Sequence, residues 1–317
     1  MKIDDRFNLR LRQEFEGRVE NGTLPEPMKR VIRLARRARS RPLQEGALVA
    51  PAALQGEVRI QTVVNAFESP SLLIRNGSFV AAASQTWAAV LEPRRGALEA
   101  VIPAVGRIEV EQHPTRRWLG TGVLVAPNIV VTNRHVALQM AAKSADGWVF
   151  APGVAGQTIS AEIDFLEEHG VSASAEFALD DVLAIENAGD PDLAFLHVAQ
   201  HPSLPHPASL GGALGPQDAV AAIGYTSKET GMPAEVEEIL TAIFGAVYDL
   251  KRLAPGRVLA VGGDRISHDC STQGGNSGSA LVEIESGLVA GIHFEGGLTE
   301  NHAVPADVVQ PRLDAVA

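Results

Sequence analysis

The sequence predicts a mainly β protein built from antiparallel sheets, preceded by a smaller and mostly helical region. From about Val105 onward, short β-branched runs recur between Gly, Pro and Asn residues, a pattern typical of antiparallel sandwiches and barrels. Before that point, apolar residues follow the helical period instead. We therefore expect an accessory or regulatory region over residues 1–100 and a β domain over residues 101–317.

Helical spacing dominates the N-terminal region. Apolar residues at i, i+3 or i+4 predict three helical segments: 7–19, 28–38 and 87–91. The second follows Pro25 and Pro27, which are favoured in the first turn of a helix, and the third ends before Pro93. Between the second and third helices, Glu57–Val64 alternates like a short strand.

Eight short apolar runs predict the strands of the β domain. They are Val105–Val110, Thr121–Val125, Ile129–Thr132, Leu193–Val198, Ala219–Gly224, Val258–Val261, Ala280–Ile284 and Leu288–Ile292. The tract Ala142–Asp180 has few strand signals, and we expect loops or a hairpin excursion there.

Composition argues against several classes of function. The formal net charge of −11 is unfavourable for a general nucleic-acid binder, and we expect the basic run Lys29–Arg41 to be a solvated helix face. No apolar run approaches the roughly 18 residues of a membrane helix. A single cysteine, Cys270, and a charged start without an apolar signal region predict a reducing, cytoplasmic compartment.

Three segments carry residues suited to acyl transfer. His135 follows two apolar runs joined by a Pro-Asn turn, Asp192 opens an alternating run, and Ser277 lies in the glycine-rich turn Gly274–Ser279. A serine hydroxyl is a weak nucleophile until a histidine takes its proton, and a carboxylate fixes the imidazole tautomer. Each signal is weak alone, but all three in this order and context predict a His135, Asp192 and Ser277 triad.

Glycines around the serine allow the backbone to bend, so that two amides converge on the developing oxyanion. We expect these donors to be the N–H groups of Gly275 and Ser277, each worth about 2.7–4 kcal/mol to the transition state. No metal site is expected, because His201 and His206 lack a third ligand at suitable spacing.

The three segments resemble those of the chymotrypsin-like serine peptidases, in particular the bacterial glutamyl endopeptidase and high-temperature-requirement branches. The matching residues are Thr132–Val136, Asp192–Ala194 and Gly274–Ser279, and the similarity covers about residues 105–315. It implies a double antiparallel β-barrel with a C-terminal helix. It also implies a serine endopeptidase that cuts protein or peptide substrates through an acyl-enzyme, without a cofactor.

The sequence disfavours one route of activation and one other hydrolase fold. Residue 276 is Asn, where zymogen-activated relatives carry an Asp that pairs with a new N-terminal amine, so that activation route is not expected. A nucleophile elbow requires Gly where Ser279 stands, and too few residues follow Ser277 to complete that fold.

The resemblance also suggests residues for the S1 pocket. Ser271 stands six residues before the serine, where Asp would favour Arg or Lys substrates. Thr272 and His293 match the positions that receive an acidic P1 side chain in glutamyl endopeptidases. The competing interpretation is that His293 is a structural histidine and the pocket takes a small or apolar side chain; Glu295 would oppose an acidic P1 if it faced the pocket.

Two further questions stay open at this stage. Residues 1–100 are expected to restrain the peptidase or to bind a regulatory partner, because an uncontrolled cytosolic protease would be harmful. The alternatives to an endopeptidase are a protease-fold binding or scaffold module with an unused triad, and a non-peptidase acyl hydrolase on the same barrels.

Overall fold

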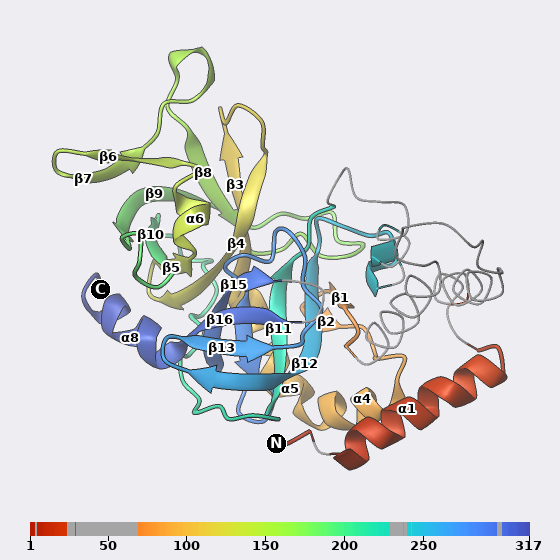
Figure 1. Cartoon of the computed structure of the whole chain (residues 1–317). Helices are drawn as coiled ribbons and strands as arrows, with labels where there is room; N and C mark the ends of the chain where they lie inside the picture. The colour runs from red at the N-terminus through yellow and green to blue at the C-terminus, as the bar shows by residue number, and fades with distance from the viewer. Residues whose placement is uncertain are drawn as a thin grey trace, which may run out of the picture.

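The structure, a computed structural model, is dominated by two antiparallel β-barrels (Figure 1). It describes residues 1–3, 5–23, 29, 69–228, 237, 240–241, 243–296 and 300–317. The mainly β, double-barrel fold class predicted from the sequence is confirmed. Each of the eight predicted strands overlaps a barrel strand, so these predictions are also confirmed.

The first barrel is a closed ring of six strands in the order β10-β5-β4-β3-β8-β9. Its strands are β3 (Val105–Glu111), β4 (Trp118–Ala126), β5 (Ile129–Thr132), β8 (Ser160–Asp164), β9 (Glu176–Ile185) and β10 (Ala194–Val198). Inward side chains are β-branched or aromatic and fully buried, among them Val123, Val131, Ile163 and Phe195.

The expectation of loops or a hairpin over Ala142–Asp180 is wrong where two barrel strands form. A hairpin does form from β6 (Ala141–Ser144) and β7 (Gly147–Phe150), but β8 and the first half of β9 then complete the barrel. The β9 strand carries polar residues outward, including Asp180 and Asp181, so its apolar residues do not form a continuous run. Packing against β8 and β10 decides its conformation.

The second barrel also has six strands, which close because β11 pairs with both β12 and β14. They are β11 (Ala219–Tyr225), β12 (Lys251–Gly262), β13 (Arg265–His268), β14 (Ala280–Glu283), β15 (Val289–Gly296) and β16 (Asn301–Pro305). The long β12 pairs first with β11 and then with β13. The helix α8 (Ala306–Asp314) follows directly on β16.

Buried polar contacts tie the two barrels together behind the site. The Tyr225 hydroxyl donates to the Leu166 carbonyl at 2.8 Å. The ammonium group of Lys251, which is fully buried, donates to the carbonyls of Phe165 at 2.6 Å and Ile102 at 3.1 Å. Burial lowers the pKa of Lys251 to about 8. These bonds fix the position of one barrel relative to the other. The first barrel carries His135 and Asp192, and the second carries Ser277.

The N-terminal region packs on the second barrel. Its elements are α1 (Asp5–Glu20), β1 (Leu72–Arg75), β2 (Ser78–Phe79), α4 (Gln85–Leu91), η1 (Glu92–Arg94), α5 (Arg95–Glu99) and η2 (Ile102–Ala104). β1 extends the sheet by pairing with β12, and the Phe7 ring of α1 meets Trp87 of α4 edge-on at 4.9 Å. Part of this region is thus integral to the second barrel.

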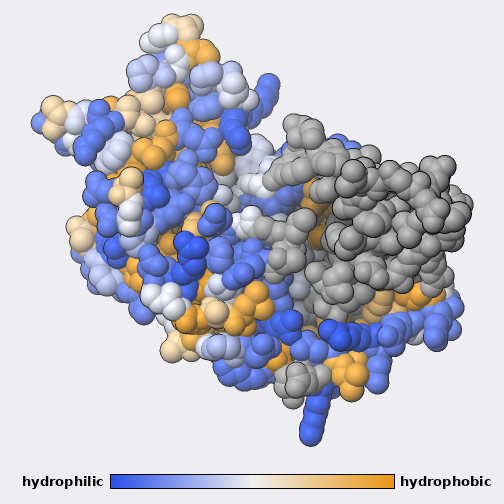
Figure 2. Space-filling view, in the orientation of Figure 1, coloured by the Kyte–Doolittle hydropathy of each residue, from blue (hydrophilic) through white to orange (hydrophobic). Residues whose placement is uncertain are grey.

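The predicted helix at 7–19 and the helical turn at 87–91 are confirmed. The helix expected at 28–38 and the strand expected at 57–64 lie outside the described residues, Lys29 excepted. On the face shown in Figure 2, hydrophilic side chains cover much of the surface and hydrophobic ones are scattered between them. In the described part of the chain, every helix is too short or too polar to cross a bilayer.

Candidate active site

Strand pairing brings His135 and Asp192 together. His135 lies in the short helix α6 (Arg134–Ala137), directly after β5, and Asp192 lies just before β10. These two strands are neighbours, with Thr132 opposite Ala194, so the residues that follow one and precede the other meet at the same end of the barrel. Ser277 comes from the second barrel, in the loop before β14.

The three side chains form one chain of hydrogen bonds. Nδ1 of His135 lies 2.6 Å from Oδ2 of Asp192, and its Nε2 lies 2.8 Å from Oγ of Ser277. The backbone N–H of His135 donates to the second carboxylate oxygen at 3.1 Å. The residues that the sequence predicted as a triad therefore lie within proton-transfer distance of one another.

Asp192 is held as a carboxylate. Burial raises its pKa, but the hydrogen bonds and charge of His135, together with the nearby Arg134, outweigh burial and leave the pKa below its ordinary value. The loop itself is braced: the side-chain amide of Asn133 donates to the Asp192 carbonyl at 2.9 Å, and Arg134 donates to the Asp190 carbonyl at 3.0 Å. The imidazole thus has a fixed, charged partner.

The loop that carries Ser277, residues Gly274–Ser279 (the serine loop), requires glycine at two positions. Gly275 has φ +87° and Gly278 has φ +89°. A Cβ at 275 would overlap the Trp118 ring, and one at 278 would overlap the Thr121 carbonyl. The Thr121 amide in turn donates to the Ser277 carbonyl at 2.8 Å, which joins this loop to the first barrel.

Two backbone N–H groups of the serine loop are available to bind a substrate oxygen. Within the part of the chain that the structure describes, the N–H groups of Gly275 and Ser277 have no protein acceptor, whereas those of Asn276, Gly278 and Ser279 are bonded. Free amides on either side of Asn276, next to the Ser277 hydroxyl, suit the binding of an oxyanion.

Asn276 is satisfied within its own surroundings. It is buried, and its amide donates to Oγ1 of Thr226 at 3.0 Å and to the Gln273 carbonyl at 3.1 Å. Its side-chain oxygen accepts from Ser279 at 3.3 Å. A neutral amide in this place holds the loop without an ion pair.

The residues proposed for S1 are engaged with the protein. The hydroxyl of Ser271 donates to the Ser69 carbonyl, and that of Thr272 donates to the side chain of Asn301 at 2.7 Å. His293 is 3 % exposed, with Nδ1 lying 3.3 Å from Nε2 of His268. Among the described contacts, no side chain of the three predicted S1 residues bonds to the triad.

His293 supports the serine loop through its backbone. Its carbonyl accepts from the Gly278 amide at 2.8 Å, and its amide donates to the Ser279 carbonyl at 2.9 Å. Burial, with smaller contributions from His135 and His302, lowers the pKa of His293 to about 3. The side chain is therefore a neutral imidazole at pH 7.

Two cavities open beside the triad, and the sequence predicted neither. One, of about 420 Å³, is lined by His135 and Asp192 and by Phe294 and Glu295 of β15. The other, of about 1130 Å³, is lined by Gly274 and Gly275 and by residues around Trp118. The only local feature of the sequence that could have indicated the larger cavity is the run of two basic residues and one aromatic residue, Arg116, Arg117 and Trp118.

The family model of the trypsin-like peptidase domain matches residues 120–292, more than half of the chain, and this span includes His135, Asp192 and Ser277. The chain belongs to the trypsin-like peptidase family. The predicted resemblance to the chymotrypsin-like peptidases is confirmed at the level of this family. No curated protein sequence matches this trypsin-like peptidase.

Two solved structures are similar to part of this trypsin-like peptidase. The serine endoprotease from Yersinia pestis is 19% identical, with a TM-score of 0.47, over 70% of this chain and 66% of that one. Deg5 is 21% identical, with a TM-score of 0.47, over 69% of this chain and 92% of that one. The chain thus spans slightly less than two thirds of the Yersinia pestis protein.

Proposed function

We propose that this chain is a serine endopeptidase in which His135, Asp192 and Ser277 form the catalytic triad. The observation that supports it most is the continuous chain from the Asp192 carboxylate through His135 to the Ser277 hydroxyl, with distances of 2.6 and 2.8 Å. Family membership and the two free amides of the serine loop point the same way.

In the acylation step, Oγ of Ser277 attacks the carbonyl carbon of the scissile bond while its proton passes to Nε2 of His135. The negative charge that develops on the carbonyl oxygen is received by the amides of Gly275 and Ser277. Asp192 stabilises the imidazolium through Nδ1. Collapse of the intermediate breaks the C–N bond, and His135 gives its proton to the leaving amine.

In the deacylation step, water takes the place of the amine. His135 removes a proton from the water as its oxygen attacks the acyl carbon, and the same two amides receive the oxyanion. The ester bond to Oγ then breaks, Ser277 regains its proton from His135, and a carboxylic acid is released. Apart from the substrate and water, both steps use only side chains and amides of this chain.

The proposal includes a regulatory role for residues 1–100 and a reducing, cytoplasmic compartment. Two sets of contacts support the first: Glu14 of α1 accepts bonds from residues 84–86 and so ties α1 to α4, and the Ser69 carbonyl accepts from Ser271, one of the predicted S1 residues. A buried, unpaired Cys270 supports the second. Because β1 belongs to the barrel sheet, point changes such as Glu14→Gln test regulation better than deletion.

Peptide cleavage by matched variants tests the proposal. Ser277→Ala should lower kcat by about 10⁶-fold, whereas Ser286→Ala, in the exposed turn between β14 and β15, should cleave as the parent does. Equal cleavage by Ser277→Ala and the parent, with both proteins folded, would contradict the proposal, and a folded parent that cleaves nothing would favour a binding module. Ester and peptide substrates compared side by side separate an endopeptidase from another acyl hydrolase.

A further inference from the structure

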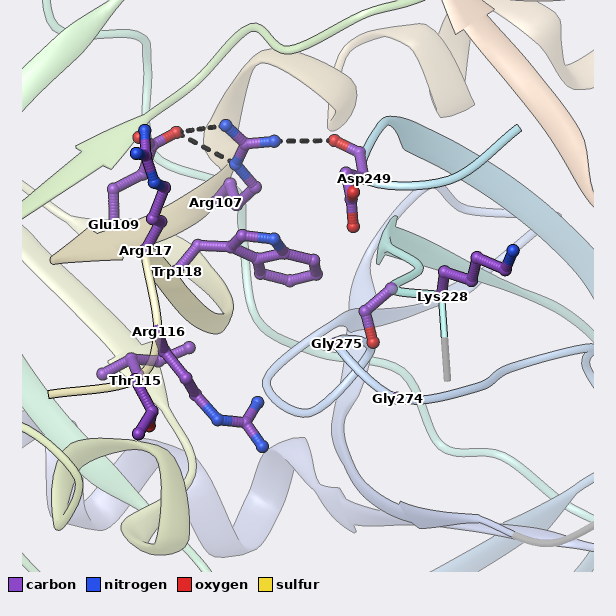
Figure 3. A pocket seen from close by; sticks show the side chains of 12 residues that line it. Arg107, Glu109, Thr115, Arg116, Arg117, Trp118, Lys228, Asp249, Gly274 and Gly275 are labelled. Atoms are coloured by element: carbon purple, nitrogen blue, oxygen red, sulfur yellow. Dashed lines mark hydrogen bonds and ion pairs between the residues drawn. The ribbon is translucent and has the colours of Figure 1, made fainter. Parts of the chain in front are cut away.

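The larger cavity lies next to the proposed oxyanion site. Gly274 and Gly275 form one side of it, and the Trp118 ring, which Gly275 contacts, forms another. Figure 3 shows this ring between Arg107 and Gly275, with Lys228 extending beyond the glycine. Its volume of about 1130 Å³ slightly exceeds the range of roughly 300–1,000 Å³ typical of small-ligand pockets.

The carboxylates of this cavity already have partners. Glu109 accepts two bonds from Arg107, at 2.9 and 2.6 Å, and Arg107 also binds Glu167 at 2.7 Å and the Asp249 carbonyl at 2.7 Å. The Asp249 side chain is hydrogen-bonded to Trp118. Arg107 is shared between Glu109 and Glu167 and neutralises only part of their charge, but the lining itself holds two carboxylates against four cationic side chains.

The arginines at the rim do not have such partners. Arg116 and Arg117 line the cavity and are exposed, and among the described residues neither guanidinium is paired with a carboxylate. Lys228, on another part of the lining, has one ion pair within the described part of the chain, an exposed one with Glu237 at 3.6 Å. The cavity thus presents unpaired positive charge on a chain whose net charge is −11.

The cavity also faces one particular half of a substrate. The acyl-side wall suggested by the resemblance is the segment around His293 in β15, and the smaller cavity contains Phe294 and Glu295 of that strand. The larger cavity has no lining residue from β15 and none in common with the smaller one. It therefore lies on the leaving-group side of Ser277.

We propose that this cavity is a subsite for acidic residues on the leaving-group side of the scissile bond, with Arg116 and Arg117 as its specificity-determining residues. The inference rests on the proposed peptidase function and names the substrate class: proteins with two or more acidic residues just after the cleaved bond. Planar guanidinium groups suit carboxylates because they can donate two parallel hydrogen bonds.

The expected effect is moderate, because both arginines are exposed. One exposed ion pair changes affinity by about 1.5- to 5-fold, so two should give a preference of roughly tenfold at low salt. Raising the ionic strength to 1 M shortens the Debye length to about 3 Å. The preference for acidic residues should therefore shrink with added salt.

Three peptides with one acyl half and different leaving halves test the subsite. With Glu-Glu, Gln-Gln or Lys-Lys directly after the cleaved bond, kcat/KM should fall in that order. The variant R116E/R117E should reverse the order and cleave the Lys-Lys peptide fastest. R6E/R10E has the same change of net charge on the exposed face of α1 and should keep the original order.

Equal kcat/KM for the Glu-Glu and Gln-Gln peptides, or an order unchanged by R116E/R117E, would overturn the subsite. If the enzyme cleaves no peptide at all, the proposed function has failed, and binding decides the subsite separately. Fluorescence anisotropy of a labelled Glu-Glu peptide on the Ser277→Ala chain should show tighter binding than that of a labelled Gln-Gln peptide, and R116E/R117E should reverse the difference. Equal binding of both peptides would again overturn it.

Discussion

His135 and His293 have opposite environments in one molecule. The side chain of His135 is 44% exposed at the mouth between the barrels, with a carboxylate on one ring nitrogen and a hydroxyl on the other. His293 is 3 % exposed inside the second barrel, beside a second buried imidazole, His268. The first lies against a carboxylate, which stabilises positive charge on the ring, whereas the second is kept neutral by burial.

The two histidines differ because of their positions relative to the strands and not because of their residue type. His135 follows the end of β5, where the chain leaves the barrel, so its ring reaches the interface of the two barrels. His293 lies within β15 at an inward position, so its ring joins the core. The predictions below test this difference, beginning with the largest effect.

Replacing each histidine by glutamine should separate catalysis from folding. His135→Gln should lower kcat by about 10⁶-fold, as for a base removed from a complete triad, with little change in unfolding because the side chain is partly exposed. His293→Gln should leave a triad that still reacts but a less stable chain. Peptide kinetics and chemical denaturation of both variants provide the measurements. A full loss of kcat in His293→Gln, with native stability, would contradict the assignment.

The charge on Asp192 should matter more than its size. Asp192→Asn keeps the side-chain shape but presents an amide to Nδ1, which favours the wrong imidazole tautomer. We expect kcat at pH 7 to fall by about 10⁴-fold. Steady-state kinetics with matched circular dichroism spectra measure this, and a loss below tenfold would mean that Asp192 does not act through His135.

The oxyanion donors should depend on the backbone of the serine loop. Gly275→Ala introduces a Cβ against the Trp118 ring at a φ of +87°, so the amide at 275 must move. Loss of one such donor costs about 10²–10³-fold in kcat. Gly262→Ala is the control, because a Cβ there meets nothing within 4 Å. Equal kcat values for the two variants would exclude Gly275 as a donor.

The buried histidines should make stability depend on pH. The unfolded chain protonates His293 near its ordinary pKa of 6.5, whereas burial keeps the folded pKa at about 3. The unfolded state therefore binds more protons in between, and the free energy of unfolding should decrease below pH 6.5 by about 1.4 kcal/mol per pH unit for each such histidine. This stability is fully present above pH 6.5.

Urea denaturation between pH 7 and 5 measures this slope, since most carboxylates stay ionised there. His293→Gln should reduce the slope by about one proton, and the exposed His206→Gln is the control. An unchanged slope in His293→Gln would mean that His293 is not held neutral in the folded chain.

Much of the site was predictable because its signals are local. Each triad residue follows or precedes an apolar strand, and strands with flanking turns are visible in sequence. The burial of His293 could not be decided from the sequence, because β15 does not alternate between polar and apolar residues, and its inward face is set by pairing with β14 and β16.

Other features depend on contacts between distant segments. β8 and β9 were missed because their outer faces carry charged residues, and because β8 pairs with β3, which is distant in the sequence. The lining of the larger cavity includes Arg107, Trp118, Asp249 and Gly275. The first and last of these are 168 positions apart in the sequence (275 − 107). No local pattern indicates such a combination, although the Arg116-Arg117-Trp118 run supplied part of its lining.

Covalent labelling of the full chain by a fluorophosphonate tests the central claim most directly. If His135 activates the Ser277 hydroxyl, the reagent should modify that residue, and tryptic mass spectrometry should find the adduct on Ser277 and not on its buried neighbour Ser279. His135→Gln should abolish the reaction. A folded chain that stays unlabelled at Ser277, or that labels equally in His135→Gln, would contradict the account.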